Sequence, residues 1–348
     1  MPDTENQLLE ILRKTTDGQK IRGASFAIKK GEFSWLGAAG DLTTEQPYFI
    51  ASTTKLFTTA LILALKSEGK LNLNDTIGQY LDESLLRRLH VFKGTDYSSE
   101  IQIIHLLAHS SGLPDYFQGK APGGISLESE ILNGKDQAWS LPDVLERTRN
   151  IPALFPPGTK DKAHYSDTNF QLLGAIAEKI TGKTFDFLCR TMVTEPIGLQ
   201  QTWLYTDPAD NRPKNLYFKD KVLRIPLAMQ SFGPDGGIVS TSSDMLIFLE
   251  AFFGGKLFPA EYLPELQQWN RIFFPLRSGI GIHLFRLPWI LNPLGSVPEF
   301  IGHSGLSGAL AFFCPKENLL IAGTVNQVAH PDVSFRTMIK LVMALKNR

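Results

Sequence analysis

The residues of this sequence that could perform covalent chemistry begin with a serine and a lysine three positions apart. Ser52 and Lys55 stand at the start of residues 53–66, a segment that is apolar on nearly every side of a helix. Positions i and i+3 share one face of a helix, so the Lys55 amine can reach the Ser52 hydroxyl. A serine hydroxyl is a weak nucleophile until a neighbouring base takes its proton. The pair therefore indicates an activated serine nucleophile.

Helix capping is the alternative interpretation of Ser52, because serine is a common N-cap before an apolar helix. The same spacing recurs at Ser67 and Lys70. Ser67, however, lies at the C-terminal end of the segment, beside Gly69, where the helix dipole disfavours an anion. Of the two serines, only Ser52 is placed for chemistry.

A tyrosine and an aspartate could serve the same reaction. Tyr165 and Asp167 lie just before a predicted helix at residues 169–180. A tyrosine phenol can relay a proton if a nearby cation lowers its pKa. Tyr165 could instead pack through its ring, and Asp167 could cap the helix. Thr168 with Gln171 already matches a capping box, which leaves Asp167 without a required capping role.

A third group, His303-Ser304-Gly305, is followed by Leu306 and a predicted strand at residues 309–314. Glycines beside an edge strand let a substrate approach the backbone closely. His303 could also be a purely structural histidine. The sequence around Ser304 resembles half of a nucleophile elbow, but Leu306 occupies the position of the second glycine. We set the elbow aside on this ground, and a Ser-His-Asp hydrolase that uses Ser304 stays as a rival hypothesis.

Together the three groups resemble the fingerprint of the penicillin-recognising serine hydrolases, which include class C β-lactamases, DD-peptidases and related esterases. In chain order the motifs are Ser52-Thr53-Thr54-Lys55, Tyr165-Ser166-Asp167 and His303-Ser304-Gly305. Residues 106–114 and 236–241 are similar to two further segments of that family, so the resemblance covers residues 50–326. It implies that Ser52 attacks an acyl carbonyl and that water later hydrolyses the acyl-enzyme. It also implies that Lys55 and Tyr165 move the proton.

The same resemblance implies that the backbone N–H groups of Ser52 and Leu306 hold the oxyanion, at on the order of 3 kcal/mol per donor. It implies no cofactor and no metal. His105 and His109 have the i, i+4 spacing of a metal-binding helix, but no third ligand accompanies them in sequence, so we interpret them as core residues.

Two departures from the family pattern affect the expected substrate. Asp167 replaces an asparagine, and its carboxylate would favour the charged ammonium of Lys55. We therefore expect Tyr165 to carry the proton, with Lys55 as the cation that keeps its phenolate accessible. His303 replaces a lysine and is mostly neutral at pH 7, so recognition of a substrate carboxylate should weaken. The substrate-binding residues are then Asp167, His303, Gly305 and Leu306, and esters or small amides are favoured over penicillins.

Three alternatives to an esterase stay open. The protein could be a β-lactamase or a D-amino acid-specific peptidase, which keep the same acyl-enzyme chemistry. It could also be a penicillin-binding sensor or pseudoenzyme that acylates without turnover. The expected partner in each case is a small-molecule ester, amide or β-lactam-like substrate.

The elements that must position these residues predict an α+β fold of the β-lactamase/transpeptidase-like type. Strand and helix patterns alternate at both ends of the chain, whereas the middle is helical with long loops. The two ends should form one antiparallel sheet flanked by helices, with a mainly helical lobe inserted. We assign residues 1–58 together with 230–348 to the sheet domain and 59–229 to the helical domain, with the active-site cleft between them. At the head, predicted strands at 23–28, 32–38 and 48–50 form a meander.

Composition limits the function further. The 348 residues are 43% hydrophobic, and 35 basic residues balance 35 acidic ones, so a nucleic-acid partner is not expected. No apolar run is long enough for a membrane span. Cys189 and Cys314 lie in apolar runs and should be buried free thiols. As written the chain predicts a cytoplasmic protein, or a periplasmic or secreted one if a leader was trimmed; its oligomeric state is open.

Overall fold

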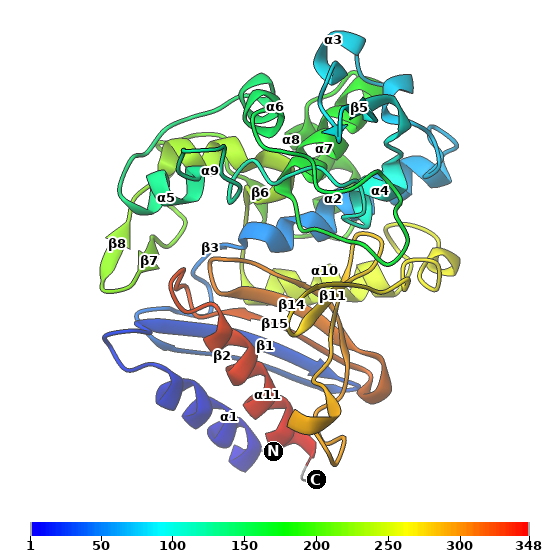
Figure 1. The fold of residues 1–348 in the computed structure, drawn as a ribbon. Helices are drawn as coiled ribbons and strands as arrows, with labels where there is room; N and C mark the ends of the chain where they lie inside the picture. The colour runs from blue at the N-terminus through cyan, green and yellow to red at the C-terminus, as the bar shows by residue number, and fades with distance from the viewer. Residues whose placement is uncertain (1, 347–348) are drawn as a thin grey trace.

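The computed structural model describes residues 2–346, and its largest element is an eight-stranded antiparallel sheet. Both ends of the chain contribute strands, because β1 pairs with β15 so that Ile28 faces Ile321. This pairing confirms the predicted α+β architecture, with one antiparallel sheet built from the two ends (Figure 1). In their order across the sheet the strands are β10 (Asn270–Phe273), β11 (Leu276–Ser278), β12 (His283–Phe285), β13 (Phe300–Ser304), β14 (Ala309–Cys314), β15 (Leu319–Thr324), β1 (Gly23–Lys30) and β2 (Phe33–Gly40).

Helices cover both faces of this sheet (Figure 1). Successive residues of a strand point to opposite faces, and β1 is buried on both. Phe26 and Ile28 pack in the apolar cluster that includes α1 (Pro2–Thr15) and α11 (Asp332–Lys346). Ala27 belongs to the larger cluster that includes α10 (Ser242–Phe253). The six buried residues of the strand, Gly23–Ile28, are accordingly all small or apolar.

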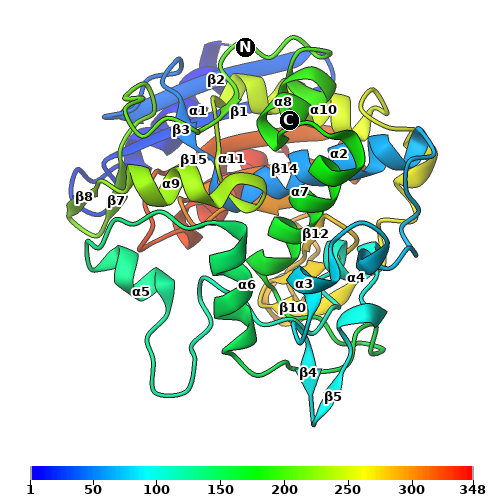
Figure 2. The same cartoon turned by 90° about the horizontal axis from the view of Figure 1, so that it is seen from above.

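The helical part of the chain lies on the far side of α10 from α1 and α11 (Figure 1). Its centre is α2 (Lys55–Ser67), which is buried on nearly all sides and packs against α7 (Asp167–Thr181), as the view from above shows (Figure 2). The other helices are α3 (Glu83–Leu86), α4 (Ile103–Leu107), α5 (Leu127–Leu132), α6 (Leu141–Arg149), α8 (Phe185–Leu188) and α9 (Pro226–Phe232). Two short hairpins are β4 (Val91–Phe92) with β5 (Thr95–Asp96), and β7 (Leu216–Phe218) with β8 (Lys221–Leu223). The predicted division at residues 58 and 230 stays a prediction.

The third strand of the head lies outside the predicted meander. β3 (Tyr48–Phe49) pairs with β9 (Ile238–Ser240), which also pairs with β6 (Trp203–Leu204). The buried Tyr48 hydroxyl lies 3.0 Å from Ser242 Oγ at the start of α10, which ties the strand to that helix instead of to β2. The predicted meander is therefore wrong at its third strand.

Strand β12 begins only at His283. Gly281 has a φ of +71°, and a Cβ there would lie 2.4 Å from the Thr59 side chain of α2. The chain therefore turns between β11 and β12 where it touches the central helix.

Two composition-based expectations can be compared with the structure. Cys189 and Cys314 are buried free thiols, as predicted. Among residues 2–346, no helix combines the length and the apolar character that crossing a membrane requires.

Candidate active site

Ser52 lies in a 3₁₀ turn, Ala51–Thr54, that leads directly into α2. Lys55 is the first residue of α2, is fully buried, and donates a hydrogen bond of 3.1 Å from Nζ to Ser52 Oγ. Ala51 has a φ of 46°, a backbone conformation that a residue other than glycine adopts only at an energetic cost. The N-cap positions of the two helical segments are Ile50 and Thr54, so Ser52 is not a capping residue. The structure brings together the serine and lysine of the first motif.

The Lys55 ammonium has two further partners. It donates to the backbone oxygen of Asp235 at 2.6 Å and forms an ion pair of 2.6 Å with Oδ1 of Asp167. Both carboxylate residues are buried. The predicted contact between Asp167 and Lys55 is therefore present.

The expected capping box at Thr168 and Gln171 is wrong. The helix begins two residues earlier than predicted, at Asp167, with Ser166 at the N-cap position and no side-chain cap. Thr168 Oγ1 donates to the backbone oxygen of Pro114. Gln171 Nε2 donates to Oδ2 of Asp235 at 2.9 Å, so this glutamine belongs to the polar network below the site.

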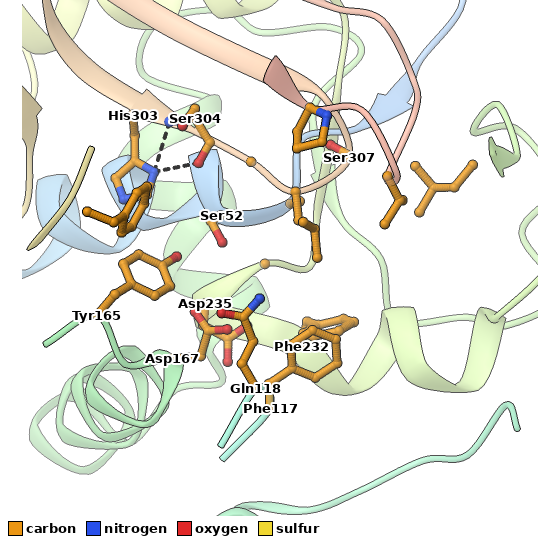
Figure 3. Close-up of a pocket in the computed structure, with 18 of the residues that line it drawn as sticks. Ser52, Phe117, Gln118, Tyr165, Asp167, Phe232, Asp235, His303, Ser304 and Ser307 are labelled. Carbon is orange, nitrogen blue, oxygen red and sulfur yellow. Dashed lines mark hydrogen bonds between the residues drawn. The ribbon is translucent and has the colours of Figure 1, made fainter. Parts of the chain in front are cut away.

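Tyr165 precedes the N-cap of α7, and its phenol points toward Ser52 (Figure 3). The centre of its ring lies 5.1 Å from Lys55 Nζ. Burial raises the pKa of Tyr165 well above its usual range, and the Asp167 carboxylate raises it further, while a hydrogen bond with Ser52 lowers it. The net direction keeps Tyr165 as a neutral phenol. The expectation that the Lys55 cation keeps the phenolate accessible is therefore wrong for the resting site.

Three buried histidines stand beside Tyr165. The rings of His283 and His303 stack with their centres 4.0 Å apart, and the His109 ring stacks on Tyr165 at 4.6 Å. Burial lowers the pKa of all three, with the neighbouring Lys55 adding to the effect, and the pKa of His283 falls to about 3. All three imidazoles are neutral at pH 7, so His303 supplies no fixed cation.

His303 does not activate Ser304 in this arrangement. Its Nδ1 lies 2.8 Å from the backbone oxygen of Ser304 and 3.0 Å from its backbone nitrogen, and none of the described carboxylates bonds to its ring. Ser304 ends β13 and is followed by a turn and β14, so the strand-to-helix context of a nucleophile elbow is absent there. The rival Ser-His-Asp hypothesis finds no support in the geometry.

Gly305 lets β13 approach Ser52 closely. A Cβ at this position would lie 2.3 Å from the backbone oxygen of Ile50 and 3.1 Å from the backbone nitrogen of Ser52. Glycine at this position therefore permits the close approach of the two backbone segments. Neither the Ser52 N–H nor the Leu306 N–H donates to another described residue, and both residues line the same cavity. These two donors are in place to receive an oxyanion.

Two acidic residues of the site were missed from the sequence. Asp115 accepts from the backbone N–H of Asp167 at 3.1 Å, and Tyr116 donates to Oδ2 of Asp235 at 2.9 Å. Burial raises the pKa of Asp115 to about 7 and that of Asp235 well above its usual range, and Asp167 adds to both shifts. Asp235 directly precedes the Gly236-Gly237 segment, which is the one signal that could have pointed to it.

His109 and His283 were also missed. His109 has a φ of 54° and follows the end of α4, so it does not share a helix face with His105, which lies against Gly158. His283 lies in an otherwise apolar run and carries no local signal. Only the pairing of β12 with β13, which sets His283 opposite Gly302, brings it to the site.

The site opens into a cavity of about 350 Å³. Its polar lining includes Ser52, Tyr165, Asp167, Asp235 and His303. Within the described part of the chain, no lysine or arginine lines it. Most of the remaining wall is apolar and includes Phe117, Ile131, Leu132, Leu216, Leu223, Ile225, Met229, Phe232, Phe273, Phe274, Leu276, Leu306, Val328 and Phe335.

Comparisons with known proteins agree with the fold. The sequence profile of the family described as Beta-lactamase matches residues 8–342. The chain is 25% identical to the N-acetylmuramyl-L-alanine amidase of Bacillus subtilis, over 93% of this chain and 78% of that protein. Its fold is similar to that of the D-amino acid amidase from Ochrobactrum anthropi SV3 complexed with L-phenylalanine amide, with a TM-score of 0.81, 21% identity and 99% of each chain covered. It is also similar to the D-stereospecific amidohydrolase from Streptomyces sp., with a TM-score of 0.77, 23% identity, and 95% and 97% coverage.

Proposed function

The chain belongs to the Beta-lactamase family of penicillin-recognising serine hydrolases, and on this premise we propose that it cleaves an ester or amide bond through an acyl-enzyme on Ser52. One observation carries the proposal. Ser52, Lys55 and Tyr165 meet at one end of a cavity in which two backbone N–H groups remain without an acceptor among the described residues.

In the proposed reaction, Ser52 Oγ forms a bond to the acyl carbon and its proton passes to the Lys55–Tyr165 pair. The carbonyl oxygen becomes an oxyanion held by the N–H groups of Ser52 and Leu306. When the tetrahedral intermediate collapses, the bond to the leaving group breaks and the proton returns to that group. Water then attacks the acyl-enzyme, gives its proton to the same pair, and Ser52 recovers it.

The proton balance of the resting site determines which form is active. Lys55 is paired with Asp167, and Tyr165 is a neutral phenol because burial and Asp167 raise its pKa. Neither group can accept a proton in that form. We infer that the active form has lost one proton from the pair, so kcat/KM rises with pH.

The lining of the cavity favours substrates without a carboxylate. β-Lactams and D-Ala-terminated peptides present a carboxylate, which a fixed cation would bind. The described lining contains no lysine or arginine, and burial lowers the pKa of His303, which keeps its ring neutral. Esters and small amides with an apolar acyl group are therefore the proposed substrates. The amidase names of the relatives support the amide part of this proposal.

Two measurements test the proposal. Intact-protein mass spectrometry after brief exposure to activated esters, β-lactams and D-amino acid amides should detect one acyl adduct, which Ser52→Ala removes and Ser304→Ala keeps. Steady-state rates should be higher on an aryl butyrate than on a chromogenic cephalosporin. Faster cephalosporin turnover would defeat the substrate preference, and an adduct that never turns over would identify a penicillin-binding sensor instead.

A further inference from the structure

Two carboxyl groups of the cavity lining, those of Asp167 and Asp235, lie next to a single ammonium group, that of Lys55. Lys55 Nζ pairs with the carboxylate of Asp167, but it contacts only the backbone oxygen of Asp235. In the described part of the chain, the Asp235 side chain forms no ion pair within 4.0 Å. This group of three side chains is therefore short of one positive charge.

The hydrogen bonds of Asp235 leave one of its oxygens for a ligand. Tyr116 Oη and Gln171 Nε2 both donate to Oδ2, each at 2.9 Å. Oδ1 accepts from no described residue, and Asp235 lines the cavity. Burial and the neighbouring Asp167 raise the pKa of Asp235 well above its usual range, which agrees with the missing counter-charge. A cationic ligand would supply that charge.

The groups around Asp235 suit a small cation with an apolar substituent. Figure 3 shows Asp235, Asp167 and Gln118 grouped on one side of Ser52, next to Phe117 and Phe232. The two aromatic rings pack edge to face with their centres 5.0 Å apart. Acceptor oxygens thus lie next to an apolar wall.

The nucleophile is close enough for one small acyl group to span both features. Ser52 Oγ and the backbone oxygen of Asp235 both contact Lys55 Nζ, at 3.1 and 2.6 Å, so they lie within about 6 Å of each other. Asp235 is thus near enough to Ser52 for an amino group on the carbon next to the reacting carbonyl to reach its side chain.

Building on the hydrolase function proposed above, we propose that Asp235, together with Asp167, binds the ammonium group of an α-amino acyl ester or amide. The apolar side chain of that substrate lies against Phe117 and Phe232. The ammonium donates to the open oxygen of Asp235, and the acyl carbonyl faces Ser52. Asp235 is then a specificity-determining residue.

The test compares substrates that differ only at the amino group. Each enantiomer of phenylalanine p-nitroanilide is measured against 3-phenylpropanoyl p-nitroanilide and N-acetylphenylalanine p-nitroanilide. A charge-assisted hydrogen bond of this kind predicts that kcat/KM for at least one free-amine enantiomer exceeds that of the des-amino compound by about tenfold to a hundredfold. Asp235→Asn should reduce this ratio toward one. Asp332→Asn serves as the matched control, because Asp332 is half-exposed at the rim and already paired with Arg336 at 2.6 Å, so the ratio should persist.

The outcomes separate this inference from the function on which it rests. Equal rates on the free-amine and des-amino compounds would overturn the inference and leave the hydrolase function standing. Absence of both turnover and an acyl adduct with every compound would overturn the hydrolase function itself. An equal loss on both substrates in Asp235→Asn would reveal a merely structural aspartate. If that variant does not fold, inhibition of the unmodified protein decides: 2-phenylethylamine should inhibit butyrate hydrolysis at least tenfold more strongly than 2-phenylethanol, and equal inhibition refutes the inference.

Discussion

Replacing Asp167 by asparagine should move the pH dependence of the reaction. Asp167 is one cause of the raised pKa of Tyr165, after burial. Asparagine keeps the volume and removes the negative charge, so the pKa of Tyr165 falls. Because the proposed active form lacks one proton on the Lys55–Tyr165 pair, the rising limb of kcat/KM should move to lower pH.

The size of the shift follows from the distances. Lys55 Nζ lies 2.6 Å from Asp167 Oδ1 and 5.1 Å from the centre of the Tyr165 ring, so the carboxylate is within about 8 Å of the ring. At an effective dielectric constant of about 20, two unit charges about 8 Å apart interact by about 2 kcal/mol. One pKa unit corresponds to about 1.4 kcal/mol, so the limb should move by about 1.5 units.

The assay is a pH profile of kcat/KM on an aryl butyrate, with thermal unfolding measured in parallel. Removing the counter-ion of a buried ammonium can itself cost about 3 kcal/mol of stability, so the profile is taken well below the Tm of the variant. Asp332→Asn at the rim should leave the limb where it is. If Asp167→Asn leaves both the limb and the rate unchanged, the electrostatic role of Asp167 is refuted.

Two further predictions concern the backbone approach at the nucleophile and the buried histidines. Gly305→Ala should lower kcat by about a hundredfold, because the new Cβ would lie 2.3 Å from the Ile50 oxygen and displace an oxyanion donor. Gly78→Ala is the control and should leave kcat unchanged, since its Cβ would meet only one side chain, at 3.9 Å. Equal kcat values for Gly305→Ala and the unmodified protein would contradict the close-approach argument. The pKa of His283 is lowered to about 3, so the unfolded chain binds a proton at a higher pH than the folded one, and its contribution to stability is lost as pH falls from about 6.5 towards 3. Urea unfolding at pH 7, 5 and 4 should show that His283→Phe reduces the slope of the unfolding free energy against pH by about 1.4 kcal/mol per pH unit. An unchanged slope would mean that another group binds the proton on unfolding.

Local patterns in the sequence were sufficient for the parts of the protein that depend on near neighbours. The contact between Ser52 and Lys55 needs only the geometry of one helical turn, and it was predicted from spacing alone. Strand β14 was predicted with the bounds that the structure has, because its apolar pattern and its flanking residues agree. The sheet built from both ends also followed, since strand patterns occurred at both ends of the chain.

Tertiary structure alone decided which distant groups surround Lys55. Asp235 lies 180 positions further along the chain, and His283 reaches the site only through the pairing of β12 with β13. The neutral phenol of Tyr165 follows from burial next to Asp167, which reversed the direction expected from the lysine alone. Periodicity indicates that a residue is buried but not which groups share its burial, and in a low-dielectric interior those neighbours determine its charge. For that reason the contact between Ser52 and Lys55 could be predicted from sequence, whereas the charges of the groups around it, and the substrates proposed from them, depended on the fold.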